Sequence, residues 1–249
     1  LAGGVVRTPA LVRDETTNFI VGAALLPAGR PEEELTGFLG LLFRRHGLPW
    51  RVALPAPRAH TPMSVWLMRA GLGIDFVPAG SMMPETEHQQ LAARLAALPS
   101  YQRAALEERL HQADLLHPLY EPRAIPENQA KALLEQIRAQ QNFGGKQEAL
   151  QQRSPLSLYR PSERAMPEKL PELAYAPEAE IRLVSEKGIF TFQRRLVHVG
   201  RAFAGLEVEL KPTPLAGHHF VFFAGQMLGQ VDLTAAEMDE TTSLPLRAF

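Results

Sequence analysis

Acidic side chains in two short stretches are the residues best able to hold a divalent metal ion. Asp14 and Glu15 are adjacent at a predicted turn, and Glu85 and Glu87 lie near the start of a predicted helix. Hard divalent cations require anionic oxygen ligands, which carboxylates supply. The competing interpretation of the first pair is a turn or capping role. That of the second pair is a favourable charge interaction with the helix N-terminus. The spacing favours these structural roles over a metal site.

Histidine spacing offers a second candidate for metal chemistry. His111, Asp114 and His117 recur every three residues along a predicted helix, but Pro118 follows and the sequence shows no further convergent ligand. His60 and Ser64 are close in sequence without the pattern of a catalytic triad. No nucleophile elbow, phosphate loop or HExxH motif is present, so the sequence predicts neither a zinc site nor an activated nucleophile.

Basic residues of the C-terminal segment form the remaining candidate site. They are Lys187, Arg194, Arg195, Arg201 and Lys211, with His198, His218 and His219 nearby. Such a set can contact a few phosphates. Glu186, Glu207 and Glu209 dilute the patch, so a solvated surface without a ligand is the alternative interpretation.

Composition limits the class of protein. The 249 residues contain 26 basic and 27 acidic side chains, which argues against a surface that is basic throughout. Cysteine is absent, which excludes disulfides, thiolate metal sites and thiol nucleophiles and fits a reducing cytosol. No apolar run reaches the length of about 18 residues that a membrane span needs. We therefore expect a cytoplasmic protein with no membrane partner.

Strands and helices alternate through the first hundred residues. The predicted strands cover 10–13, 19–26, 51–54 and 74–77, and the predicted helices cover 31–46, 63–70 and 84–98. The helix over 31–46 has apolar residues at i, i+3, i+4, i+7 and i+8, with acids in its first turn and arginines in its last. This order is typical of an α/β layer with helices packed on a sheet. Two further helices are predicted over 101–116 and 126–141.

Prolines and then a change of period mark the domain boundaries. Residues 143–177 contain regularly spaced prolines and are interpreted as a semi-extended linker, after a domain over 1–142. From 178 to 235 the period becomes two, with turns predicted at 186–188 and 215–217, which indicates a small all-β barrel. Residues 236–249 form a tail.

Several stretches resemble bacterial insertion-sequence transposases that have a retroviral-type integrase core. ALVRDETTNF resembles the family's LTVLDDHSRF, and LLFRRHGLPWRVAL matches its helix, Gly-Leu-Pro turn and strand. TPMSVWLMRAGLGIDF matches its next helix and strand, and QNFGGKQEALQQRSPLSLYRPS resembles its YNFxRPHEALxxxPPxxxYxPS stretch. GIFTFQRRLVHVGRAFAGLEVELKPT is similar to the barrel that follows. The matches occur in order over most of the chain.

The resemblance implies a core like ribonuclease H, in which an Asp, Asp, Glu triad binds two magnesium ions and joins DNA strands. Here Pro55 stands at the position of the second acid and Gln89 at that of the third, whereas the first would precede Leu1. Neither residue is anionic, so we expect no catalytic residue, no metal site and no cofactor.

The function expected from this pattern is that of a transposase-derived, DNA-associated pseudoenzyme. Its partners would be DNA and either a second copy or a related active transposase. Two alternatives stay open: an active transposase performing metal-dependent strand transfer in DNA integration with acids assigned differently, and a decaying gene product without a selected role.

Overall fold

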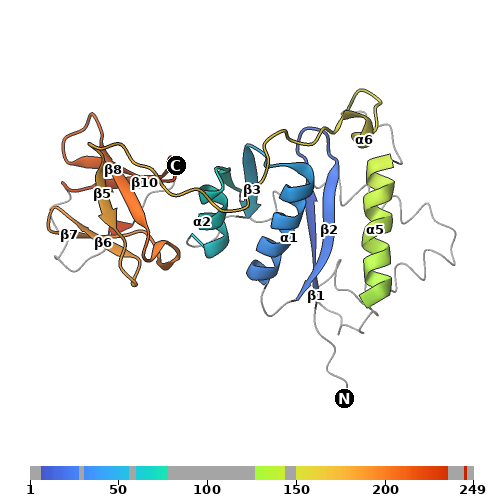
Figure 1. Ribbon diagram of the computed structural model, residues 1–249, viewed down its shortest axis with the longest axis horizontal. Coiled ribbons are helices and arrows are strands. Elements are labelled where there is room, and N and C mark those ends of the chain that lie inside the picture. The colour runs from blue at the N-terminus through green and yellow to red at the C-terminus, as the bar shows by residue number, and fades with distance from the viewer. Residues whose placement is uncertain are drawn as a thin grey trace, which may run out of the picture. The chain divides into compact units, whose positions relative to one another are not determined.

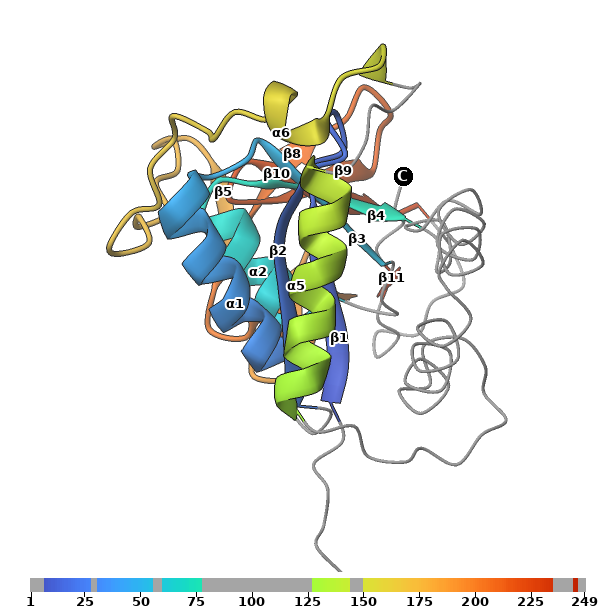
Figure 2. The ribbon, with the colours of Figure 1, turned by 90° about the vertical axis from the view of Figure 1, so that its right-hand side faces the viewer.

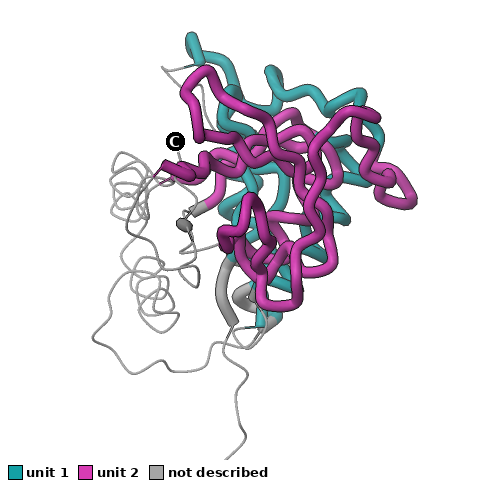
Figure 3. Tube along the Cα trace, turned by 90° about the vertical axis from the view of Figure 1, so that its left-hand side faces the viewer, with its two compact units in different colours: residues 1–48, 83–165 teal, residues 49–82, 166–249 magenta. Residues whose placement is uncertain are grey.

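Two compact units make up the chain, and each combines segments that are far apart in the sequence. The computed structural model describes residues 7–27, 31–55, 60–77, 127–143, 150–234 and 244–245. Unit 1 comprises Leu1–Leu48 and Met83–Ala165, and unit 2 comprises Pro49–Met82 and Met166–Phe249 (Figure 3). The sequence predicts four contiguous segments (1–142, 143–177, 178–235 and 236–249), whereas each unit combines two segments that are separate in the sequence.

Unit 1 is an antiparallel pair of strands with two long helices. Its elements are β1 (Arg7–Arg13), β2 (Ile20–Pro27), α1 (Pro31–His46), α5 (Glu127–Phe143) and the short α6 (Pro155–Leu158). Both α1 and α5 pack against β2 (Figures 1 and 2). The predicted helix over 31–46 is confirmed, and its buried residues Leu39, Leu42 and Phe43 lie on the predicted apolar stripe.

A buried asparagine joins α5 to β2. The backbone N–H of Ile20 donates to Asn142 Oδ1 at 2.8 Å, and Asn142 Nδ2 donates to the Ile20 carbonyl at 3.0 Å. Asn142 is fully buried, so its amide satisfies two backbone groups that water does not reach. Nearby, the rings of Phe19 and Tyr159 stack with their centroids 4.2 Å apart. These contacts connect parts of unit 1 that are more than a hundred residues apart.

Unit 2 begins with a strand, helix and strand. The elements are β3 (Arg51–Pro55), α2 (Pro62–Arg69) and β4 (Gly73–Val77), and β3 pairs with β4 in parallel. The α2 helix begins after Thr61, which forms a capping box with Ser64, and Pro62 occupies its first turn. Each of these elements agrees with its predicted position to within two residues.

The C-terminal strands form two sheets over one core. They are β5 (Glu180–Leu183), β6 (Ile189–Phe192), β7 (Arg195–His198), β8 (Glu207–Pro212), β9 (His218–Phe223), β10 (Gln226–Asp232) and β11 (Leu244–Pro245). One sheet has the order β10-β9-β8-β5 and the other β11-β7-β6. A 3-10 helix, η2 (Arg201–Phe203), lies between β7 and β8.

The core of unit 2 is shared by both sheets and by α2. Phe192, Phe203 and Phe223 are almost fully buried, and Val65 and Met68 of α2 belong to the same cluster. The chain is thus a mixed α/β protein, as the sequence predicts. The ribonuclease-H-like core and the closure of the barrel stay predictions. The helices predicted over 84–98 and 101–116 lie outside the described residues.

Candidate nucleic-acid interface

The β6–β7 hairpin carries two arginines at one of its ends. Phe192 pairs with Arg195, which leaves Gln193 and Arg194 as a two-residue connection. Both have positive φ angles, 46° and 65°, as type I′ hairpin turns require. Gln193 and Arg194 are exposed and Arg195 is half-buried. Gln193 is not among the predicted site residues, although the two residues between IFTF and RLVH indicate a tight hairpin.

The opposite end of the hairpin brings two further cations together. Gly188 lies in the predicted turn at 186–188, and its N–H donates to the Ser185 carbonyl at 2.8 Å. Its own carbonyl accepts from the backbone N–H groups of Val199 and Gly200. A Cβ at Gly188 would lie 2.3 Å from the Gly200 carbonyl carbon. This close backbone approach places Lys187 and Arg201 on neighbouring segments.

We call these four residues the β6–β7 basic ribbon: Lys187, Arg194, Arg195 and Arg201. Within the described part of the chain none of the four has an ion-pair partner. The two ends are separated by the four residues of each strand, roughly 10 Å at the rise of an extended chain. Glu186 is the only acid between residues 185 and 203. The ribbon therefore presents a local excess of positive charge.

Lys211 does not join this set. It lies on β8 in the other sheet, where its Nζ is 3.2 Å from Glu209 Oε2 and 4.7 Å from the centre of the Phe222 ring. Beside it, Tyr175 donates to the Glu207 carbonyl at 2.6 Å, and burial together with Glu207 and Glu209 raises its pKa to about 12. The strands of this sheet carry Glu180, Glu207, Glu209 and Asp232 against Arg182 and Lys211, so this sheet has an excess of acids.

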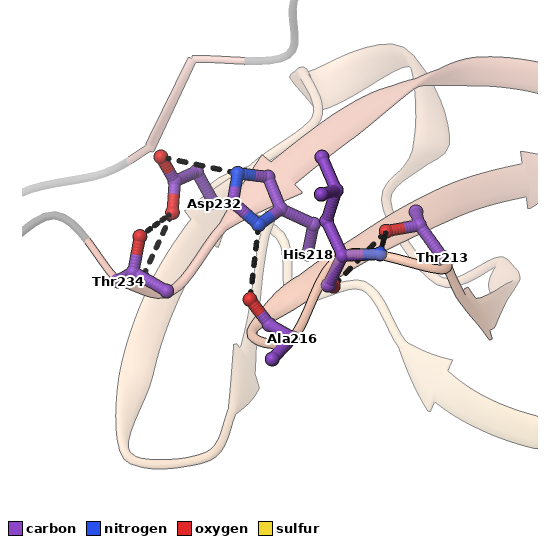
Figure 4. Close-up of polar contacts among 6 residues, drawn as sticks. Thr213, Ala216, His218, Asp232 and Thr234 are labelled. Carbon is purple, nitrogen blue, oxygen red and sulfur yellow. Dashed lines mark hydrogen bonds and ion pairs between the residues drawn. The ribbon is translucent and has the colours of Figure 1, made fainter.

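The three histidines of the predicted patch have separate surroundings. His198 is exposed at the end of β7. Figure 4 shows the His218 ring between the Ala216 carbonyl, 3.1 Å from Nδ1, and the Asp232 carboxylate, 3.4 Å from Nε2. His219 packs against Phe192, with ring centroids 4.8 Å apart. His218 and His219 thus have structural contacts within the unit.

Two described acids that could have bound a metal, Asp14 and Asp75, have structural partners. Asp14 Oδ1 accepts hydrogen bonds from the N–H and hydroxyl of Thr17, which confirms the predicted turn role. Asp75 is paired with the Arg51 guanidinium, which lowers the pKa of its carboxyl. In the described ranges no group of three or more His, Asp or Glu side chains could hold a metal ion.

The structure describes one of the two predicted triad positions, Pro55, and not the other, Gln89. Pro55 is the last residue of β3, and its backbone is in register with Val77. Gln89 lies outside the described residues, as do Glu85, Glu87, His111, Asp114 and His117.

Comparison with known families decides the class of the C-terminal segment. Residues 179–239 match the family model of the IS481 family transposase, C-terminal domain. Residues 179–239, here called the transposase domain, are thus similar to a domain of an insertion-sequence transposase. The match spans β5 to β10 of this transposase domain and includes the whole β6–β7 basic ribbon. No curated protein matches the chain. In the part that the structure describes, no helix is long and apolar enough to cross a bilayer.

A half-buried histidine lies where α2 meets the transposase domain. The His60 ring makes edge contacts with Phe76 and Phe203, at centroid distances of 5.5 and 5.2 Å. Its Nδ1 is 3.4 Å from Ser64 Oγ. Burial lowers the pKa of His60 below its ordinary value of 6.5, because the apolar contacts disfavour the charged ring.

We expect unit 2 to lose stability as the pH falls below about 7. The unfolded chain binds a proton at His60 near pH 6.5, whereas the folded chain does so only at lower pH, so protonation favours unfolding. Urea denaturation at pH 7.5 and pH 5.5, followed by tryptophan fluorescence, measures this, because the two tryptophans, Trp50 and Trp66, both belong to unit 2. His60→Gln should reduce the pH dependence; an unchanged dependence in this variant would contradict the assignment.

Proposed function

We propose that this chain is a transposase-derived DNA-associated protein that binds the DNA backbone through the β6–β7 basic ribbon and has lost strand-transfer activity. The observation that carries the proposal is the transposase-domain match over residues 179–239, which includes four cations without ion-pair partners among the described residues. The nearly neutral chain makes a local contact more plausible than a general one.

The ribbon suits phosphate contacts rather than base recognition along its strands. Guanidinium groups form paired hydrogen bonds to phosphate oxygens, and Arg194, Arg195 and Arg201 supply three of them. Cations at the two ends of the hairpin can contact phosphates at separate points of the duplex. Four such contacts give moderate affinity with a strong dependence on salt.

The proposed loss of catalysis rests on charge. We infer that the N-terminal part derives from an integrase core with a ribonuclease-H-like fold, in which two magnesium ions need three carboxylates. Pro55 has no side-chain donor atom, and Asp75, the nearest acid on the paired strand β4, is already bound to Arg51. The described residues therefore do not fit a two-metal site, and we derive no catalytic step from them.

A duplex-binding measurement at several salt concentrations tests the DNA contact. We expect the wild-type chain to bind duplex DNA, with log Kd rising linearly with log salt. Replacing the four ribbon cations together by glutamine should reduce the slope by roughly 3 to 4, since each lost phosphate contact removes about 0.9. Fluorescence anisotropy with a labelled duplex gives both quantities.

Lys211→Gln is the matched control for the four-residue variant. It also removes a cation from the transposase domain, but Lys211 is already paired with Glu209, so the salt slope should stay close to that of the wild type. The proposal would be overturned by equal slopes for the wild type and the four-residue variant, or by a larger effect of Lys211→Gln.

Magnesium titration and a strand-transfer assay test the proposed loss of catalysis. We expect no saturable heat on adding millimolar Mg²⁺ and no joined product from a pre-cut donor end. Metal-dependent joining that is lost on replacing Asp14 or Glu85 would restore the alternative, an active transposase.

A DNA-bound chain without catalysis would act by occupying sites or by associating with another protein. We propose DNA as its principal partner, and a second copy or a related active transposase as its protein partner, in the cytoplasm.

A further inference from the structure

The turn at the tip of the β6–β7 hairpin has a sequence that does not favour its conformation. Gln193 and Arg194 have φ angles of 46° and 65°, in the left-handed region. Two-residue turns of this kind favour Asn-Gly, because side chains other than those of Asn and Asp are strained there. Residues kept in a strained conformation are expected where their side chains serve a function.

The two side chains do not serve the fold. Gln193 and Arg194 are exposed, and Arg194 has no ion-pair partner among the described residues. Phe192, directly beneath the turn, is only 1% exposed and packs against His219. Phe192 therefore anchors the hairpin in the domain beneath the turn, and Gln193 and Arg194 are the exposed residues of its tip.

The reach of the tip fits the minor groove of duplex DNA better than the major groove. The minor groove is about 6 Å wide, too narrow for a two-stranded ribbon but wide enough for one arginine side chain. Filling the major groove, about 12 Å wide, would require more of the hairpin to protrude. In A·T-rich DNA the minor groove is narrower and more negative, which attracts an inserted arginine.

We propose that Arg194 enters the minor groove of A·T-rich duplex DNA, with the amide of Gln193 beside it as a donor to base-edge acceptors. The inference rests on the proposed function, since the remaining ribbon cations would bind the flanking phosphates. It adds a sequence preference to a contact that is otherwise electrostatic.

The double variant Gln193→Asn/Arg194→Gly separates the turn's conformation from its side chains. It installs the favoured turn sequence, so the variant should unfold at a higher temperature than the wild type. The wild type should bind an A·T-rich duplex roughly tenfold more tightly than a G·C-rich duplex of equal length. The variant should bind the two duplexes equally, with the salt slope reduced by only about 0.9 for the loss of Arg194.

Competition identifies the groove. A minor-groove-binding polyamide should displace the wild type from the A·T-rich duplex, whereas a major-groove-binding dye should not. Displacement by the dye alone, or an A·T preference that survives in the double variant, would overturn the inference. Wild-type binding with the expected salt slope but no A·T preference would refute this inference while leaving the proposed function intact. Failure to bind any duplex would refute the proposed function itself.

Discussion

Gly188→Ala is expected to destabilise unit 2 by about 3 to 5 kcal/mol, from strain at a positive φ together with a steric clash. Gly188 has a φ of 78°, and an added Cβ would lie 2.3 Å from the Gly200 carbonyl carbon and 2.5 Å from the Arg201 nitrogen. Both atoms belong to the backbone, so no side chain can rotate to relieve the contact. Urea unfolding followed by fluorescence of Trp50 and Trp66 measures the loss.

Gly225→Ala is the matched control. Gly225 has nearly the same φ, 77°, but no atom lies within 4 Å of its added Cβ. Only the conformational cost applies there, about 1 to 2 kcal/mol. The difference between the two variants isolates the close approach that brings Lys187 beside Arg201. Equal losses in both would show that this approach is absent.

Asn142→Leu is expected to destabilise unit 1 by about 2 to 4 kcal/mol, because it leaves the N–H and carbonyl of Ile20 buried without partners. The leucine keeps a similar volume, so the loss comes from hydrogen bonding rather than from a cavity. Hydrogen exchange at the Ile20 amide is the direct measurement, since the N–H loses its acceptor. We expect that amide to exchange much faster than in the wild type.

Gln136→Leu tests whether the effect is specific. Gln136 lies on the same helix, α5, but is exposed, so the same apolar change should alter the free energy of unfolding by less than about 0.5 kcal/mol. Unchanged protection of the Ile20 amide in Asn142→Leu would contradict the assigned bonds.

Local pattern predicted the regular elements well where apolar period and end signals agreed. The helix over 31–46 has its acids, its arginines and its apolar stripe in register, and its bounds are confirmed. The turn at 186–188 followed from a glycine between two apolar runs. Such features depend on residues that are close in the sequence, so the sequence alone predicts them.

Long-range contacts were beyond prediction because nothing local encodes them. Asn142 sits in a polar helix, and its bond to a strand 122 residues away has no sequence signal. Val65 and Met68 show only helical period, so their place in the core of the transposase domain was not foreseeable. In the sequence nothing distinguishes Lys211 from the other cations, because its contact with Glu209 appears only in the structure.

The DNA-binding role of the candidate site stays a prediction. Of the five proposed DNA-binding residues, Arg194 and Arg195 lie on the β6–β7 hairpin, and Lys187 and Arg201 lie on the segments that flank it. The family match over 179–239 confirms the resemblance to a transposase in that region. The tight turn at the tip of the hairpin is recognised only from its backbone angles, because Gln193 and Arg194 are not residue types that predict a tight turn.

The uneven distribution of charge between the two sheets has a kinetic consequence. The basic ribbon lies at the two ends of the β6–β7 hairpin, whereas the other sheet carries Glu207, Glu209 and Asp232, so the domain has an electric dipole. The electric field of DNA rotates such a domain before contact. A larger share of encounters therefore begins with the basic ribbon facing the DNA. Association should therefore be oriented as well as accelerated at low ionic strength, and both advantages should fade together as the Debye length shrinks.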